Sequence, residues 1–274
     1  MGLFYAAIGL AIFVCAAAVY ALLPGKSTLA QREAFTGVNY AHRGLHSRDK
    51  TVPENSLAAF RAAVKAGYGM ELDIALSKDG EVVVFHDDDL LRVCGVEGRV
   101  DSLTLAELQQ LRLEGTEETI PLLTQMLAVV AGSQPLIVEL KTHPTRNEEL
   151  CRKAWDILQA YSGPYCIESF DPRIVGWFYK NAPQVLRGQL SCKPQELGRG
   201  LQGFLIGTLL SNFMCRPHFI AYDTGYKPLA VRFAELFAMN VAWTVRPEND
   251  AAYWEKCADG VIFEYYLPAP RYTR

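Results

Sequence analysis

Two histidines stand in short motifs that suggest acid–base chemistry. His42 lies in Ala-His-Arg-Gly and His86 in Phe-His-Asp, and each follows an apolar run. Imidazole titrates near neutral pH, so two histidines that meet at one site can serve as general base and general acid. Either residue alone could instead be a hydrogen-bonded structural histidine. The other three are predicted to be peripheral, with His46 and His143 in loops and His218 at the start of a strand.

Three carboxylates interrupt apolar runs that are predicted to be strands. Glu71 and Asp73 occur in Met-Glu-Leu-Asp-Ile, and Glu139 occurs in Ile-Val-Glu-Leu-Lys. The i, i+2 spacing places the first two on the same face of their strand. Unpaired anions are costly to bury, and a hard divalent cation with oxygen ligands would neutralise them. We therefore predict a Mg²⁺ or Ca²⁺ site formed by Glu71, Asp73 and Glu139.

Two basic residues and one tryptophan accompany these groups. Arg43 follows the first histidine, and its guanidinium could bind a phosphate or carboxylate in a bidentate manner. Lys141, two residues after the third carboxylate, could pair with that carboxylate or with a substrate phosphate. The alternative is an interior salt-bridge network, or for Arg43 a pair with Glu54. Trp243 is predicted to be either a core residue or a wall of the substrate pocket.

The elements that must position these residues alternate between short apolar runs and helix-like stretches. This alternation is typical of βα units in a parallel sheet. Eight strands over about 230 residues match an α/β fold of the TIM (β/α)8 barrel type, predicted for residues 37–266. The carboxyl ends of barrel strands line the active face, which is where both histidine motifs fall. The strands are predicted at residues 39–42, 70–74, 136–140, 165–170, 186–190, 219–222, 241–245 and 261–263.

One apolar run breaks this alternation. Residues 81–86 are predicted to form a strand, yet the only polar break between it and the apolar run of the second strand is the four-residue segment Ser77-Lys-Asp-Gly80. A parallel crossover needs about a dozen residues. We therefore predict a β excursion after strand 2, followed by a loop and a helix over residues 105–113. Further helices are expected at residues 56–66, 148–161, 172–181, 228–238 and 251–256.

The chain begins with an uncharged apolar run over residues 2–23. As a helix it would span roughly 33 Å, enough for a hydrocarbon core of about 30 Å. We predict a single transmembrane anchor that places the protein at the cell membrane. A cleaved signal peptide and a soluble core helix are the alternatives. Lys26 and Arg32 follow the run, which favours a cytoplasmic catalytic domain.

Composition excludes other classes of function. The 274 residues carry a net charge of −3, so the chain lacks the basic balance typical of nucleic-acid-binding proteins, and no nucleic acid partner is expected. The seven cysteines are scattered without a C-x-x-C motif. This pattern is typical of reduced thiols in a reducing compartment.

A second apolar stretch covers residues 201–214 and is too short to span a bilayer. It follows the fifth strand of our prediction, so it belongs to a βα connection on the active face. It could be an ordinary barrel helix with its core face inward. It could instead be a partly exposed helix that enters the lipid interface through an apolar stripe of Phe204, Leu205, Leu209, Phe213 and Met214.

Taken in order, these motifs resemble those of the glycerophosphodiester phosphodiesterases, which are phospholipase C-like TIM-barrel enzymes. The resemblance covers residue 39 to about residue 264. Its motifs are His42-Arg43-Gly44, Pro53-Glu54-Asn55, Glu71-Leu72-Asp73, Asp79-Gly80, Phe85-His86-Asp87, Ile120-Pro121-Leu122, Glu139-Leu140-Lys141, Ser169-Phe170, Trp243-Thr244-Val245 and Asp259-Gly260.

The resemblance implies a TIM barrel with an excursion after strand 2 and metal-dependent hydrolysis of glycerophosphodiesters to glycerol 3-phosphate and an alcohol. In the mechanism usually proposed, the neighbouring glycerol hydroxyl attacks phosphorus, and water then opens the cyclic phosphate. The implied roles are acid and base for His42 and His86, metal ligation by Glu71, Asp73 and Glu139, and phosphate contact by Arg43 and Lys141.

Two departures from the family pattern concern the substrate side. Arg246 stands where the family often has Asn, and Phe263-Glu264 stands where Thr-Asp is common. The alcohol headgroup is therefore left open. The alternatives are a phospholipase of lysophospholipase D or phospholipase C type acting on membrane lipids, and an inactive module that binds lipid headgroups. The expected partners are a glycerophosphodiester or lysophospholipid substrate and the lipid bilayer.

Overall fold

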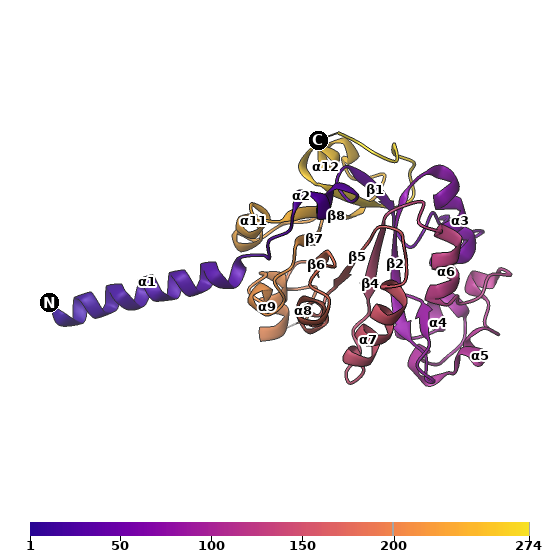
Figure 1. Cartoon of the computed structure of the whole chain (residues 1–274), viewed down its shortest axis with the longest axis horizontal. Helices are drawn as coiled ribbons and strands as arrows, with labels where there is room; N and C mark the ends of the chain where they lie inside the picture. The colour runs from indigo at the N-terminus through magenta and orange to yellow at the C-terminus, as the bar shows by residue number, and fades with distance from the viewer. Residues whose placement is uncertain (199, 274) are drawn as a thin grey trace.

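The computed structural model describes residues 1–198 and 200–273. Its first element is helix α1 (Gly2–Leu22), which projects away from the remainder of the chain (Figure 1). This helix is 21 residues long with a mean hydropathy of 2.3 over its most apolar window, and none of that window is buried. By length and composition this helix could cross a membrane. A signal sequence near the N-terminus has the same length and composition.

The remaining chain forms the predicted barrel. Eight parallel strands close into a cylinder because the first strand pairs with both the second and the last. The ninth strand, β3, adds to β2 in the antiparallel direction and lies outside the cylinder. The strands are β1 (Val38–Ala41), β2 (Gly69–Leu76), β3 (Val82–Val84), β4 (Leu136–Leu140), β5 (Tyr165–Ser169), β6 (Arg187–Ser191), β7 (Phe219–Asp223), β8 (Met239–Val245) and β9 (Gly260–Phe263).

Helices follow the strands and pack on the outside of the cylinder. Helix α3 (Leu57–Ala66), which follows β1, shows how local signals set the bounds of a helix. The Ser56 hydroxyl accepts from the Ala59 N–H at its start, and Gly67 ends it with a φ of 80°. The helices beyond α1 are α2 (Leu29–Glu33), α3 (Leu57–Ala66), α4 (Leu91–Cys94), α5 (Leu105–Leu108), α6 (Leu123–Val130), α7 (Asn147–Leu158), α8 (Pro172–Asn181), α9 (Leu201–Gly207), α10 (Asn212–Cys215), α11 (Leu229–Glu235) and α12 (Ala251–Cys257).

The side chains of each strand alternate between two cores. Leu72 and Val138 point outward into the large cluster beneath the helices, whereas Tyr40, Ile137 and Cys166 belong to the cluster inside the cylinder. Glu71, two residues before Asp73, is paired in register with Ile137. The carboxylates of β2 and β4 therefore share the inward face with apolar residues, as the i, i+2 spacing predicts.

The excursion after β2 forms a small unit with its own core. Leu90, Val93, Leu108 and Leu113 are buried there together with Val83 of β3. The helix predicted over residues 105–113 is wrong in length, because α5 ends at Leu108 and a short 3₁₀ turn follows at Leu113–Gly115. Turns rather than a continuous helix bring these leucines into one small cluster.

The second apolar stretch is also divided. Residues 201–214 were expected to form one helix, but Leu209 has a φ of 62° and is fully buried between α9 and α10. A left-handed residue cannot continue a right-handed helix. The single apolar stripe predicted from Phe204 to Met214 therefore does not exist, although both of these end residues are exposed.

Candidate active site

The carboxyl ends of three neighbouring strands carry a row of buried carboxylates. Asp73 of β2 is in register with Glu139 of β4, and Glu139 is in register with Glu168 of β5. Glu71 lies two residues earlier on the same face of β2. All four side chains are buried, with at most 6% of each residue exposed. Four carboxyl groups are thus gathered inside the mouth of the barrel.

The surroundings divide these carboxylates into two kinds. Burial, together with the charges of Asp73 and Glu139, raises the pKa of Glu71 well above its ordinary value. Burial also raises the pKa of Glu139 and Glu168. For Asp73, burial acts in the same direction, but the charges of Lys141 and other cations outweigh it and hold the pKa below its usual range.

Three of these carboxylates suit a hard cation. One oxygen from each of Glu71, Asp73 and Glu139 lies within 4.8 Å of the others. Crowded anions that burial alone would drive toward protonation are stabilised when a divalent cation takes their oxygens as ligands. The residues predicted as metal ligands are therefore brought together in a geometry that fits Mg²⁺ or Ca²⁺.

Lys141 lies beside this group, directly after β4. Its Nζ is 2.8 Å from Glu139 Oε1 and 3.4 Å from Asp73 Oδ1. Burial lowers the pKa of the Lys141 ammonium, but its two anionic neighbours outweigh burial and raise it. Lys141 therefore stays charged. It pairs with Glu139, as predicted, and also with Asp73, as predicted for an interior salt-bridge network.

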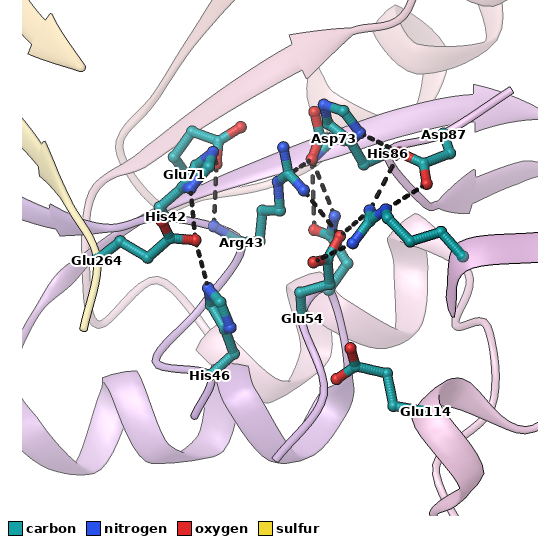
Figure 2. Close-up of polar contacts among 12 residues, drawn as sticks. His42, Arg43, His46, Glu54, Glu71, Asp73, His86, Asp87, Glu114 and Glu264 are labelled. Carbon is teal, nitrogen blue, oxygen red and sulfur yellow. Dashed lines mark hydrogen bonds and ion pairs between the residues drawn. The ribbon is translucent and has the colours of Figure 1, made fainter. Parts of the chain in front are cut away.

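His42 follows β1 and faces the end of the last strand. Its Nδ1 lies 3.4 Å from Glu264 Oε1, and its Nε2 lies 3.9 Å from Glu71 Oε2. Burial and the nearby Arg43 lower the pKa of His42 to about 4, against the opposing effect of Glu264. Figure 2 shows His42 and His46 pointing toward the same carboxylate from different sides.

His46 was predicted to be peripheral, and that prediction is wrong. Its side chain is 5% exposed, and its Nε2 lies 3.1 Å from the same oxygen of Glu264 that faces His42. His42, His46 and Glu264 also offer ligand atoms within 4.8 Å of one another. Arg246 Nε donates to the other oxygen of Glu264 at 2.7 Å and already neutralises that carboxylate, so we assign the group to positioning rather than to a metal.

His86 is positioned by an ion-pair chain that begins in the excursion. Its Nδ1 lies 2.5 Å from Asp87 Oδ1, and Arg92 binds Asp87 and Glu54 through two contacts each. Glu54 in turn accepts from Arg43 at 2.8 Å. Burial raises the pKa of Glu54, but these two arginines outweigh burial and lower it to about 2. The excursion thus supplies Arg92, which connects Asp87, the partner of His86, to Glu54. Figure 2 shows His86 beside Asp87.

Arg43 connects the ion-pair chain of His86 to the buried carboxylates of β2. It pairs with Glu54, and its Nε lies 3.4 Å from Asp73 Oδ2. Its backbone N–H donates to Glu71, and its φ is 54°. Asn55, from the predicted Pro-Glu-Asn motif, donates to Asp73 at 2.9 Å. Both salt-bridge alternatives considered for Arg43, with Glu54 and with an interior carboxylate, are therefore present.

These groups surround one cavity of about 140 Å³ at the barrel mouth. Trp243 lines it together with Phe170, with the two ring centres 5.7 Å apart in an edge-to-face arrangement. Trp243 also packs against the core cluster inside the cylinder, so both placements predicted for it are present. The cavity is lined by His42, Arg43, Glu71, His86, Glu139, Glu168, Phe170, Leu190, Trp243, Thr244, Arg246 and Ile262.

Sequence reasoning missed several residues of this mouth. Glu168 stands in the strand Tyr-Cys-Ile-Glu-Ser, and its i, i+2 relation to an inward cysteine was the available signal. Glu264 and Arg246 were noted only as departures from the family pattern, yet they bind each other. Arg92 gave no signal. The two remaining histidines lie elsewhere, with His143 on Asp101 and His218 directly before β7.

Comparison with known proteins agrees with this site. The sequence profile of the Glycerophosphoryl diester phosphodiesterase family matches residues 42–265. A Bacillus subtilis protein named as a glycerophosphodiester phosphodiesterase is 30% identical over 240 residues, which are 82% of this chain and 93% of that protein. Human lysophospholipase D is 30% identical over 145 residues, which are 48% of this chain and 44% of that protein.

Solved structures share the fold. An Oleispira antarctica phosphodiesterase in complex with the product sn-glycerol-3-phosphate has a TM-score of 0.68 at 24% identity, covering 83% of this chain and 93% of that one. A Thermotoga maritima glycerophosphodiester phosphodiesterase has a TM-score of 0.62 at 27% identity, covering 82% and 93%.

The fold and the mouth together define a TIM-barrel enzyme that acts on phosphoric diesters. The profile match and the relatives give the family. This chain belongs to the glycerophosphoryl diester phosphodiesterase family.

Proposed function

We propose that this chain hydrolyses glycerophosphodiesters to glycerol 3-phosphate and an alcohol at a membrane, with the help of a divalent cation. The observation that carries the proposal is the convergence of two histidines, a carboxylate cluster and Arg43 on one cavity of about 140 Å³. Each feature alone has a structural explanation. Their combination offers acid, base and positive charge to a phosphate in one place.

Glu71, Asp73 and Glu139 would hold the cation, Mg²⁺ or Ca²⁺. When bound, it would neutralise charge that develops on the phosphate oxygens. The donor set supports this role because it consists of oxygens alone, which hard cations prefer. Lys141 and Arg43 lie at the edge of the cluster and would add positive charge toward the same phosphate.

His42 and His86 would exchange protons with the substrate. In each case a carboxylate faces Nδ1, Glu264 for His42 and Asp87 for His86. A hydrogen bond from Nδ1–H to a carboxylate leaves Nε2 free to accept or donate a proton in the cavity. One histidine would take the proton of the attacking glycerol hydroxyl while the other protonates the leaving alcohol oxygen. Opening of the resulting cyclic phosphate by water would require the two to exchange roles.

The direct test is release of glycerol 3-phosphate from glycerophosphocholine by the purified full-length chain in detergent. We expect hydrolysis that stops after exhaustive EDTA treatment and returns when Mg²⁺ or Ca²⁺ is added. Titration with each cation separately would identify the preferred one. Hydrolysis that continues unchanged after chelation would contradict the metal assignment, and absence of hydrolysis with either cation would contradict the substrate class.

A second candidate is a lysophospholipase D activity, which shares the same reaction at phosphorus. Two observations favour it: the similarity to human lysophospholipase D and the aromatic wall of Phe170 and Trp243, which could contact an acyl chain. The test is release of choline from lysophosphatidylcholine, compared with glycerophosphocholine at equal concentration. A preference for the lysolipid would favour this candidate over the first.

We further propose that α1 anchors the chain in the cell membrane as a single span, with the barrel on the cytoplasmic side. Its apolar length supports the span, and Lys26 and Arg32 after the helix support the orientation. The described cysteines are all free thiols, as in a reducing compartment. Membrane fractionation would test the anchor, and protease protection in sealed, right-side-out spheroplasts would test the orientation.

A further inference from the structure

The C-terminal end of α1 packs against the side of the barrel. Leu22 is buried in a cluster with Leu209 and with Ala234 and Ala238 from the α11 region. The Asn212 side chain donates to the Leu22 carbonyl at 3.0 Å. The anchor and the catalytic domain are therefore joined by a packed contact, and the chain leaves the barrel at a fixed place.

Arg216, which ends α10, reinforces this contact. Its guanidinium donates to the Tyr20 carbonyl at 2.9 Å and to the Leu23 carbonyl at 2.7 Å. The same group lies 4.1 Å from the centre of the Tyr20 ring. Tyrosine and arginine at the end of an apolar helix are typical of the membrane–water interface. The interface would therefore run at the level of Tyr20 and Arg216, against α10 and α11.

The helices at this place expose apolar side chains to solvent. On α11 and the residues after it, Leu229, Phe233, Leu236 and Phe237 follow an i, i+4, i+7, i+8 spacing and form one stripe. Neighbouring Val231 is buried on the opposite face of that helix. We define the anchor-side face by its six exposed apolar members, which are Phe204, Phe213, Met214, Leu229, Leu236 and Phe237.

Two of the helices that carry the anchor-side face, α10 and α11, border α1. Helix α1 contacts both α10, which carries Phe213, and α11, which carries Leu229. Figure 1 shows α9 and α11 at the end of the barrel from which α1 projects, whereas α4 and α5 lie at the opposite end. Exposed apolar side chains gathered beside a candidate membrane span indicate an interaction site. The occupant is indicated by α1 itself, which packs against α10 and α11.

We propose that the anchor-side face rests on the bilayer, with Phe213 and Phe237 inserted among the lipid headgroups beside α1. This inference rests on the proposed anchoring of α1 and extends it from a tether to a fixed docking of the barrel. Apolar side chains at the interface gain from leaving water, as interfacial amphipathic helices do. The packed Leu22 and the Arg216 contacts then hold the barrel in one orientation on the membrane.

The docking also relates the active site to the lipid surface. Helix α9, which carries Phe204 on the anchor-side face, forms one wall of a cavity of about 340 Å³ through Gly203 and Ile206. Phe170 lines both this cavity and the one that holds the histidines. Helix α9 therefore contributes both to the anchor-side face and to the cavity that adjoins the catalytic one.

The test uses the full chain in vesicles of phosphatidylcholine and phosphatidylglycerol, with the photoreactive residue p-benzoylphenylalanine at single positions. Phe213 and Phe237 test the anchor-side face, with 50% and 51% of each residue exposed. Leu91 on α4 is the matched control, with 57% exposed. Phe13 within α1 reports on the span itself. Lipid adducts would be measured by mass spectrometry after illumination.

We expect lipid adducts at positions 13, 213 and 237, and at least tenfold fewer at position 91. Adducts at 13 without adducts at 213 and 237 would overturn the docking while leaving the anchor intact. Equal adducts at 91 and 213 would overturn it as well, since they would indicate random contact. Lack of adducts at 13 would overturn the anchor and the docking together.

A functional measurement separates this inference from the proposed reaction. In the full chain, the double variant Phe213→Ser, Phe237→Ser should hydrolyse soluble glycerophosphocholine at the rate of the parent chain. Hydrolysis of lysophosphatidylcholine presented in vesicles should fall several-fold. Equal rates on both substrates would overturn the role of the face in lipid access. Loss of glycerophosphocholine hydrolysis in the parent chain would instead count against the proposed function.

Discussion

His42 and Glu264 lie together because the first and last strands of the barrel are paired in register. Ala41 of β1 is opposite Phe263 of β9, so the residue that follows each strand meets the other, with 3.4 Å between His42 Nδ1 and Glu264 Oε1. Burial raises the pKa of Glu264, but the bonds of its histidine neighbours and the charge of Arg246 outweigh burial and hold the pKa below its usual range. The carboxylate therefore stays ionised and can orient His42.

Replacing the Glu264 carboxylate should lower kcat and leave substrate binding nearly unchanged. We expect Glu264→Ala to lower kcat on glycerophosphocholine by about 10–100-fold, the scale seen when a group that orients a functional histidine is removed. KM should change little, since Glu264 is not among the residues that line the cavity. Glu264→Gln keeps an acceptor for Nδ1–H and should recover part of the loss. A rise in KM with unchanged kcat would show that Glu264 acts on substrate binding instead.

The two departures from the family pattern should be coupled. Arg246 and Glu264 form a 2.7 Å ion pair, although each stands where relatives commonly have another residue. We expect the variants Arg246→Asn and Glu264→Asp to lower kcat/KM individually and to be non-additive in combination. A double-mutant cycle should give an interaction free energy of about 0.5–3 kcal/mol, the range for residues in contact. Additive effects would mean that the pair is incidental.

The two histidines that we propose to be catalytic should differ from His143 in their effect on activity. General acid–base groups contribute about 10²–10⁴-fold each, so His42→Ala and His86→Ala should lose at least 100-fold in kcat. His143→Ala is the matched control, because His143 binds Asp101 in the excursion and should change activity only a few-fold. His46 is unsuitable as a control, since it contacts Glu264. Similar losses in all three variants would contradict the two-histidine mechanism.

Much of this site could be predicted because the two-residue period of a strand determines which side chains point to the same face. The i, i+2 spacing of Glu71 and Asp73 placed both on one face, and the strand ends placed His42 at the mouth. Contacts made across loops could not be predicted in this way. His46 reaches Glu264 through the turn after β1, and Arg92 reaches Glu54 from the excursion, 38 residues along the chain.

The break between α9 and α10 was the other feature that could not be predicted from the sequence. Residues 201–214 are mostly apolar, and although Gly207 ends α9, the residue with the left-handed backbone is Leu209 rather than a glycine. The break arises because Leu209 is drawn into the cluster that also buries Leu22, at the cost of a left-handed backbone. Tertiary packing thus overrides the local preference for a helix. The apolar residues predicted to form one helix are instead divided between α9, the buried Leu209 and α10.

Cation binding should stabilise the fold as well as support turnover. Glu71, Asp73 and Glu139 repel one another when ionised, so a cation at 100 times its Kd should add about 2.7 kcal/mol to the free energy of unfolding. At about 2–4 °C per kcal/mol, Tm should rise by several degrees when Mg²⁺ or Ca²⁺ is added after chelation. Glu71→Gln should reduce this rise, whereas the exposed Glu97→Gln should keep it. An identical rise in both variants would place the cation elsewhere.

His218 should make the fold sensitive to mild acid. Burial, with further effects of Arg187 and Arg32, lowers the pKa of His218 to about 4 in the folded chain, against 6.5 for an ordinary histidine. Above pH 6.5 the imidazole is neutral in both states and favours neither. As the pH falls from 6.5 toward 4, the unfolded chain takes up the proton and the folded chain does not, so stability is lost across that window. Between pH 7 and pH 5 the loss should be about 1–2 kcal/mol.

The variant His218→Asn removes this proton uptake without removing the polar character of the site. Its free energy of unfolding at pH 7 should be lower than that of the parent chain, because a fully buried side chain has been shortened. Its change between pH 7 and pH 5 should nevertheless be smaller by about 1–2 kcal/mol. Denaturant unfolding of both chains in detergent at the two pH values measures the difference. Equal pH dependence in the two chains would show that the imidazole is protonated in the fold or that other groups dominate its acid response.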